Sequence, residues 1–116
     1  MADVRIEGDD VLLVLSGLEK VEGGHGDLRF PLASVRDVEV VDRPVDYLAG
    51  LKLIGMGLPG TAVGTWVSGD GEIFAVEHHA SRGLVIQLEG EKYRMLIVGA
   101  ADPNAVAEEI NKSLPG

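Results

Sequence analysis

The segment from Leu51 to Phe74 constrains the fold most strongly, because glycines interrupt its apolar stretches. It holds six of the sixteen glycines of the chain, including the hexapeptide GMGLPG at 55–60. This hexapeptide matches the G-x-G-x-x-G fingerprint of dinucleotide-binding loops, which need a helix directly afterwards. The sequence that follows, TAVGTWV, is β-branched and contains a further glycine, so it predicts a strand. Pro59 also removes a backbone N–H from the phosphate cradle. We therefore expect a structural loop over 55–60 that binds no nucleotide.

Short strand-like segments separated by turn signals make up most of the remaining chain. Alternating or continuously apolar residues identify them, and the segment 35–42 breaks its alternation in a way that predicts a bulge or a twist. The last four segments follow one another at the spacing of an antiparallel meander. Trp66 and Phe74 are expected to be buried. The expected strands are 2–7, 11–15, 27–30, 35–42, 51–54, 61–68, 72–79, 84–89 and 92–98.

The C-terminal segment, at about 102–114, carries the only convincing helical pattern. Asp102 is a suitable N-cap, and Pro103 occupies the first helical position. Its apolar residues recur at helical spacing, so one face has to cover another element, and the gap in a curled sheet is the expected partner. Ser16 and Glu19 form a capping-box pattern, which predicts a short helical turn that the following glycines end.

Composition and charge limit the function. The 116 residues suit one domain, and 10 basic against 19 acidic residues give a net charge of −9. Because the basic residues are dispersed, we expect no binding to nucleic acid, anionic membranes or phosphoinositides. The chain has no cysteine and no apolar run of the roughly 18 residues that span a bilayer. These features predict a cytoplasmic protein.

Few residues suggest chemistry. His78 and His79 are adjacent on a strand and point to opposite faces, whereas Glu77 and His79 share one face. We interpret them as exposed polar strand residues and expect no metal site and no cofactor. His25, in a glycine-rich turn, is expected to be solvated. The serines and threonines lack a neighbouring base, so we expect no enzymatic activity.

The order of these motifs resembles the bacterial pleckstrin-homology-like (PH-like) domains, in particular short stand-alone members of the actinobacterial type. The resemblance rests on PLASVRDVEV at 31–40, GLPGT at 57–61, GTW at 64–66, FAV at 74–76 and the closing helix. It implies one domain over 1–116, a mostly β fold in which two near-orthogonal antiparallel sheets form a seven-stranded barrel capped by the C-terminal helix. It also implies that oligomers occur among the relatives. The phosphoinositide-binding relatives use a basic first hairpin loop, whereas this chain has Glu7-Gly8-Asp9-Asp10 there.

We therefore expect a non-enzymatic binding or scaffolding module that acts through protein contacts or self-association, with an exposed strand edge as its means of recognition. A carrier of a small apolar ligand, in or beside the barrel, is the alternative, and an enzyme of unknown type is the third hypothesis. The candidate interaction surface consists of Tyr47, Leu48, Gly55, Gly57, Leu58, Pro59 and Gly60.

Overall fold

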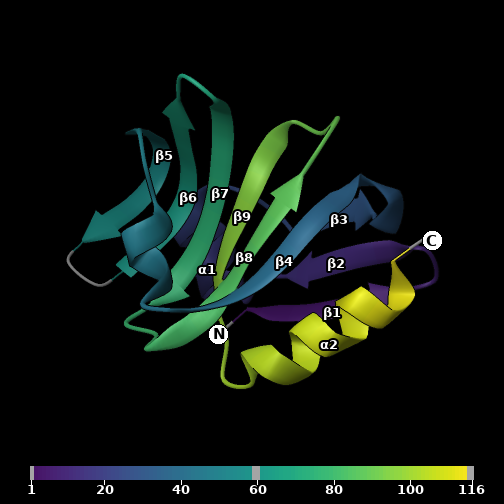
Figure 1. Ribbon diagram of the computed structural model, residues 1–116. Helices are drawn as coiled ribbons and strands as arrows, with labels where there is room; N and C mark the ends of the chain where they lie inside the picture. Colours follow the sequence, from purple (N-terminus) through teal and green to yellow (C-terminus); the bar gives the residue numbers. More distant parts are fainter. Residues whose placement is uncertain (1, 59–60, 115–116) are drawn as a thin grey trace.

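The computed structural model describes residues 2–58 and 61–114, which form two β-sheets and two α-helices (Figure 1). One sheet has the strand order β1-β2-β3, and the other has the order β4-β8-β9-β7-β6-β5. The fold is therefore mostly β with a C-terminal helix, as predicted. The strands are β1 (Asp3–Glu7), β2 (Asp10–Val14), β3 (Leu28–Pro31), β4 (Val35–Asp42), β5 (Leu51–Leu58), β6 (Thr61–Ser68), β7 (Gly71–His78), β8 (Arg82–Leu88) and β9 (Tyr93–Gly99).

Two α-helices and two short 3₁₀ turns connect or flank the strands: α1 (Gly17–Gly23), η1 (Leu32–Ser34), η2 (Pro44–Tyr47) and α2 (Pro103–Ser113). The predicted capping box of α1 is confirmed, because the Ser16 side chain accepts from the Glu19 N–H and the Glu19 side chain accepts from the Ser16 N–H. The predicted cap of α2 is confirmed too, since the Asp102 side chain accepts from the Ala105 N–H. The segment 35–42 was expected to contain a bulge or a twist, and β4 has a bulge between Val35 and Asp37.

The predicted meander is wrong. β7 pairs with β9 in parallel, while β8 lies on the other side of β9 and also pairs with β4. In a meander β8 would lie between β7 and β9, whereas here β9 lies between β7 and β8. Its residues are apolar on both faces and nearly all are buried, as a strand in the middle of a two-sided sheet requires.

The two sheets do not close into a barrel, so that expectation is wrong as well. Instead, α2 packs against β1, β4 and β8 and covers the side where the two sheets meet (Figure 1). Ala107 and Ile110 are the buried residues on its apolar face. The helix therefore covers a gap between sheets, rather than the mouth of a closed barrel.

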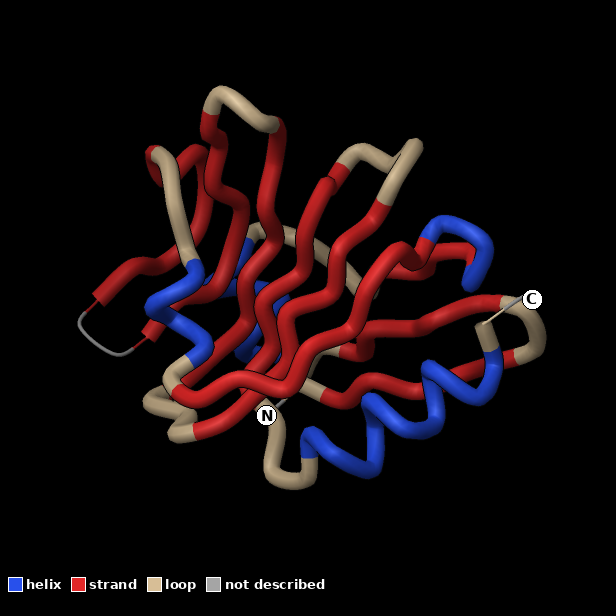
Figure 2. Tube along the Cα trace, viewed as in Figure 1, coloured by secondary structure: helices blue, strands red, loops and turns tan. Residues whose placement is uncertain are grey.

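The six-stranded sheet buries apolar residues on both faces. One cluster fills the space between the two sheets and includes Phe74, and a second cluster on the opposite face includes Trp66. The segment around η2 covers this second cluster with Val45 and Leu48, and Figure 2 shows η2 and α1 on opposite sides of the sheet. The predicted burial of Trp66 and Phe74 is confirmed.

The glycine-rich loop expected over 55–60 is instead a strand as far as Leu58, and Pro59 and Gly60 lie outside the described residues. β5 pairs antiparallel with β6, and Gly55 lies opposite Gly64. Both have positive φ, and a Cβ on either would lie 2.2 Å from a carbonyl oxygen of the other strand. These glycines therefore allow two backbones to cross closely, which no other residue type permits here.

Candidate interaction surface

β5 forms one edge of the six-stranded sheet. In the described part of the chain its one hydrogen-bonded neighbour is β6, so its outer N–H and C=O groups face away from the sheet. Three large apolar side chains of this strand are exposed: Leu51 by 82%, Leu53 by 64% and Ile54 by 52%. We call these three residues, with the outer backbone of β5, the β5 edge.

Neighbouring elements extend this apolar exposure. Val67 pairs with Leu51 and is also exposed. Helix α1 packs against β5 and β6, and a Cβ on its capping residue Gly24 would lie 2.9 Å from the Ile54 side chain. The same helix exposes Leu18 and Val21. Exposed apolar side chains thus occur on three elements in mutual contact, and exposed apolar patches of this kind often mark interaction sites.

The β5 edge is also poor in charge. Lys52 is the one charged residue between positions 47 and 69, although the whole chain contains 29 charged residues, 10 basic and 19 acidic. The other edge strands of the two sheets expose more charged side chains. β1 and β4 expose several acidic and basic side chains, and β3 exposes Arg29. Hydrogen bonds to Glu7 and Asp10 raise the pKa of the Arg29 guanidinium above its usual value.

A bulge divides the β5 edge into two parts. Lys52 lies opposite Trp66 and Ile54 lies opposite Thr65, which leaves Leu53 as the extra residue. A bulge redirects a side chain and ends regular pairing locally. From Ile54 to Leu58 the strand again pairs residue by residue with β6. This regular segment is the part of β5 best suited to accept another strand.

The residues predicted for the interaction surface fall into different places. Tyr47 is exposed at the end of η2, whereas Leu48 is half-buried against the second apolar cluster. Gly55 and Gly57 lie within β5, as does the backbone of Leu58, and Pro59 and Gly60 lie outside the described residues. Sequence reasoning missed Leu51, Leu53 and Ile54, because it treated LKLI as an ordinary strand. The absence of acidic residues between positions 47 and 69 is a feature of the sequence that could have drawn attention to them.

A cluster of polar side chains, formed by His78, Glu19 and Glu22, holds α1 on the sheet. The two nitrogens of His78 face two carboxylates of α1, with Nε2 3.1 Å from Glu22 Oε1 and Nδ1 3.6 Å from Glu19 Oε2. Glu19 is buried, and its other oxygen belongs to the capping box. Because the carboxylates lie at opposite nitrogens of the ring, the three groups cannot converge on one metal ion. Within residues 2–58 and 61–114 no cluster of three ligand side chains suits a metal.

Three expectations about polar residues need correction, and the first is His78, which was expected to be exposed but is half-buried against α1. Glu77 was expected to be exposed but is buried, and its carboxylate accepts from the backbone N–H of Ala80, so it stabilises the turn after β7. His25 was expected to be solvated but is half-buried, and its ring lies edge-on to Phe74 and Tyr93, at centroid distances of 5.4 and 6.0 Å. Its packing covers the edge of the core beside β3.

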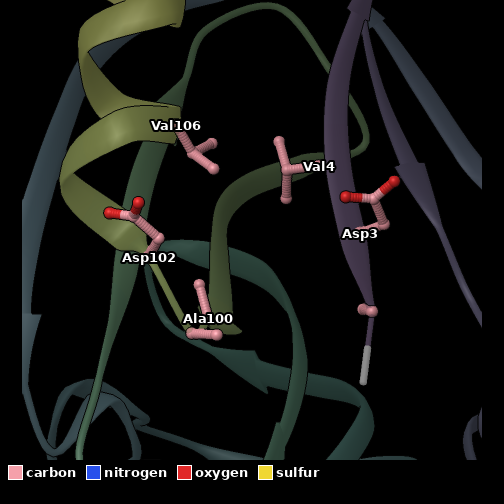
Figure 3. Close-up of a pocket in the computed structure, with 7 residues that line it drawn as sticks. Asp3, Val4, Ala100, Asp102 and Val106 are labelled. Carbon is pink, nitrogen blue, oxygen red and sulfur yellow. The ribbon is translucent and has the colours of Figure 1, made fainter.

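The hollows described on the molecule are open to solvent. One of about 250 Å³ lies between the start of β1 and the start of α2, where Val4, Ala100 and Val106 approach one another (Figure 3). Asp3 and Asp102 lie on opposite sides of this hollow. The Asp3 carboxylate accepts a hydrogen bond from Arg5, and the Asp102 carboxylate accepts one from the Ala105 N–H at the start of α2. A larger hollow of about 440 Å³ is lined by residues of the first hairpin, η1 and Ser113. Asp9 and Asp10 also line this second hollow, but the Ser113 hydroxyl donates to the backbone carbonyl of Glu109 within α2.

Comparison with protein-family models, with curated proteins and with solved structures finds no match for this chain. The resemblance to PH-like domains therefore stays a prediction. Among the described residues, no helix has the length and apolar character needed to cross a membrane.

Proposed function

We propose that the protein is a non-enzymatic interaction module whose binding surface is the β5 edge. The observation that carries this proposal is the exposure of Leu51, Leu53 and Ile54 on a sheet edge that lacks acidic side chains. A partner would add a strand to β5, so that main-chain hydrogen bonds provide affinity and the apolar side chains become buried. Helix α1, fixed by the His78 cluster, flanks that strand.

The packing between the sheets favours this role over a ligand carrier. A continuous cluster of large apolar residues fills the space between the two sheets, and the hollows described above lie on the outside. The PH-like relationship remains part of the proposal, in the form of a PH-like fold whose two sheets stay open and whose closing helix covers the junction. One fold can host many unrelated functions, so the site, rather than the fold, identifies the function.

Site-specific photocrosslinking tests the proposal. A photoreactive side chain at position 53, introduced in the source cells, should form covalent adducts with a polypeptide. The same group at Asp37, exposed on β4, should form far fewer. Adding Leu51→Lys to the position-53 variant should reduce its adducts. Equal labelling from positions 53 and 37, or none from position 53, would contradict the proposed binding surface.

A further inference from the structure

We infer that the hollow between η2 and the turn after β7 binds the ammonium group of a small aliphatic amine. The hollow has a volume of about 240 Å³, and its lining residues belong to the start of η2, the end of β7 and the turn that follows. β6 separates β7 from β5 in the sheet, so this site is distinct from the β5 edge and goes beyond the proposed function. The lining residues are Arg43, Val45, Glu77, His79, Ala80 and Ser81.

Glu77 places a buried carboxylate at this hollow. The residue is only 2% exposed, and its Oε1 accepts a hydrogen bond from the backbone N–H of Ala80. Its Oε2 is also buried and has no hydrogen-bond partner among residues 2–58 and 61–114. A buried carboxylate is costly unless its charge and its oxygens find partners. An ammonium group in the hollow would supply both the missing hydrogen bond and the opposite charge.

The face of β7 that Glu77 occupies is otherwise apolar. Ile73 and Ala75 precede it at alternate positions, and both belong to the apolar cluster that includes Trp66. An apolar side chain at position 77 would therefore continue this cluster. The hydrogen bond to Ala80 uses only one oxygen of Glu77, so the other oxygen is available to a ligand.

The remaining lining residues suit an alkyl amine. Val45 and Ala80 are half-buried and offer apolar surface to a short hydrocarbon chain. Arg43 brings a positive charge to the exposed side of the hollow, but its Nε lies 3.4 Å from the Asp46 carboxylate, which offsets that charge. The net charge of −9 attracts a cationic ligand towards the molecule.

The backbone holds the two sides of the hollow together. Arg43 and His79, one on each side, have positive φ angles of 48° and 51°, which residues other than glycine rarely adopt. The Arg43 N–H donates to the Ser81 carbonyl oxygen at 2.9 Å and so joins the start of η2 to the turn. Strained backbone of this kind occurs preferentially at functional sites such as ligand clamps. The hollow is therefore built by two segments that are bonded to each other.

NMR titration of the natural chain with n-butylammonium, in a buffer free of other amines, tests the inference. The amide signal of Ala80, whose N–H donates to Glu77, should shift and reach saturation. n-Butanol has the same chain without the charge, and butyltrimethylammonium has the charge without an N–H donor. Both should bind more weakly by about tenfold or more, because neither forms a charge-assisted hydrogen bond. Equal binding of the three compounds, or the absence of a saturating shift at Ala80, would overturn the inference.

Two variants that each remove one negative charge locate the site. Glu77→Gln keeps the size of the side chain and should lower the affinity for n-butylammonium by about tenfold or more. Glu109→Gln, at an exposed position on α2, should bind like the natural chain. Circular dichroism shows whether each variant is folded. A folded Glu77→Gln variant that binds as tightly as the natural chain would contradict the assigned site. If that variant does not fold, the comparison of the three compounds on the natural chain decides the question.

Discussion

The two edges of the six-stranded sheet differ in nearly every property that governs strand pairing. The β4 edge exposes four charged side chains and has α2 packed against it. The β5 edge has Lys52 as its one charged residue and exposes three large aliphatic side chains. Charges and covering helices are the usual means by which proteins prevent unwanted pairing at sheet edges.

The β4 edge therefore carries the features that block another strand, whereas the β5 edge lacks them, in keeping with the proposed binding surface. Had the apolar residues of β5 served only the fold, they would lie in one of the two buried clusters, as most apolar residues of β6 and β7 do. The bulge at Leu53 protects only part of the edge, since regular pairing resumes at Ile54. We expect substitutions on the two sides of the sheet to act on different quantities: stability at the β4 side and association at the β5 side.

The largest effect on stability should come from the helix that covers β4. Ile110 is buried within the main cluster, so Ile110→Ala should lower the free energy of unfolding by about 2–5 kcal/mol. The matched truncation on the other side, Leu53→Ala, should change it by no more than about 0.5 kcal/mol in monomeric protein, because Leu53 is exposed. Urea denaturation of dilute protein measures both. Similar losses at the two positions would remove the contrast between the edges.

A smaller effect should come from the glycine crossing that holds β5 on the sheet. Gly64→Ala places a Cβ against the Ile54 carbonyl oxygen, in a backbone conformation that side chains disfavour, and should cost about 1–3 kcal/mol. Gly69→Ala, in an open turn, is the matched control and should be neutral or slightly stabilising. Thermal unfolding of both variants is the measurement. A neutral Gly64→Ala would show that the strands do not cross as closely as described.

The smallest effect should come from the cap of α1, the helix beside β5. Ser16→Ala removes the hydroxyl that accepts from the Glu19 N–H and should cost about 1 kcal/mol. Ser16→Thr, which keeps the hydroxyl, should restore most of the loss. Urea denaturation of dilute protein compares the variants with the natural chain. If alanine and threonine behave alike, the capping box contributes little to holding α1 beside the β5 edge.

Local features of the fold were largely predictable from the sequence. Alternation located the strands, and the capping patterns at Ser16 and Asp102 located the helix starts, because both depend on residues close together in the chain. The order of strands was not predictable in this way. The central place of β9 depends on which strands compete for its two edges, and no local pattern encodes that competition.

The candidate surface was only partly predictable, for a related reason. The strand character of Gly55–Leu58 depends on Gly64 of the opposite strand, since only a glycine there lets the backbones cross. In the same way, the role of His78 depends on Glu19 and Glu22, which are more than fifty residues away in the chain. Long-range partners of this kind are set by packing and do not appear in a local sequence pattern.

Amide hydrogen exchange along β5, measured on the protein alone and with an extract of its source cells, tests the β5 edge most directly. We predict that the outward-facing amides between Ile54 and Leu58 exchange at least tenfold more slowly with the extract, because a partner strand would pair with these groups, whereas the amides that already pair with β6 are protected in both samples. Amides of β4 should exchange at the same rate in both samples. Unchanged exchange in β5, or protection that appears in β4 instead, would contradict the proposal that the β5 edge is the binding surface.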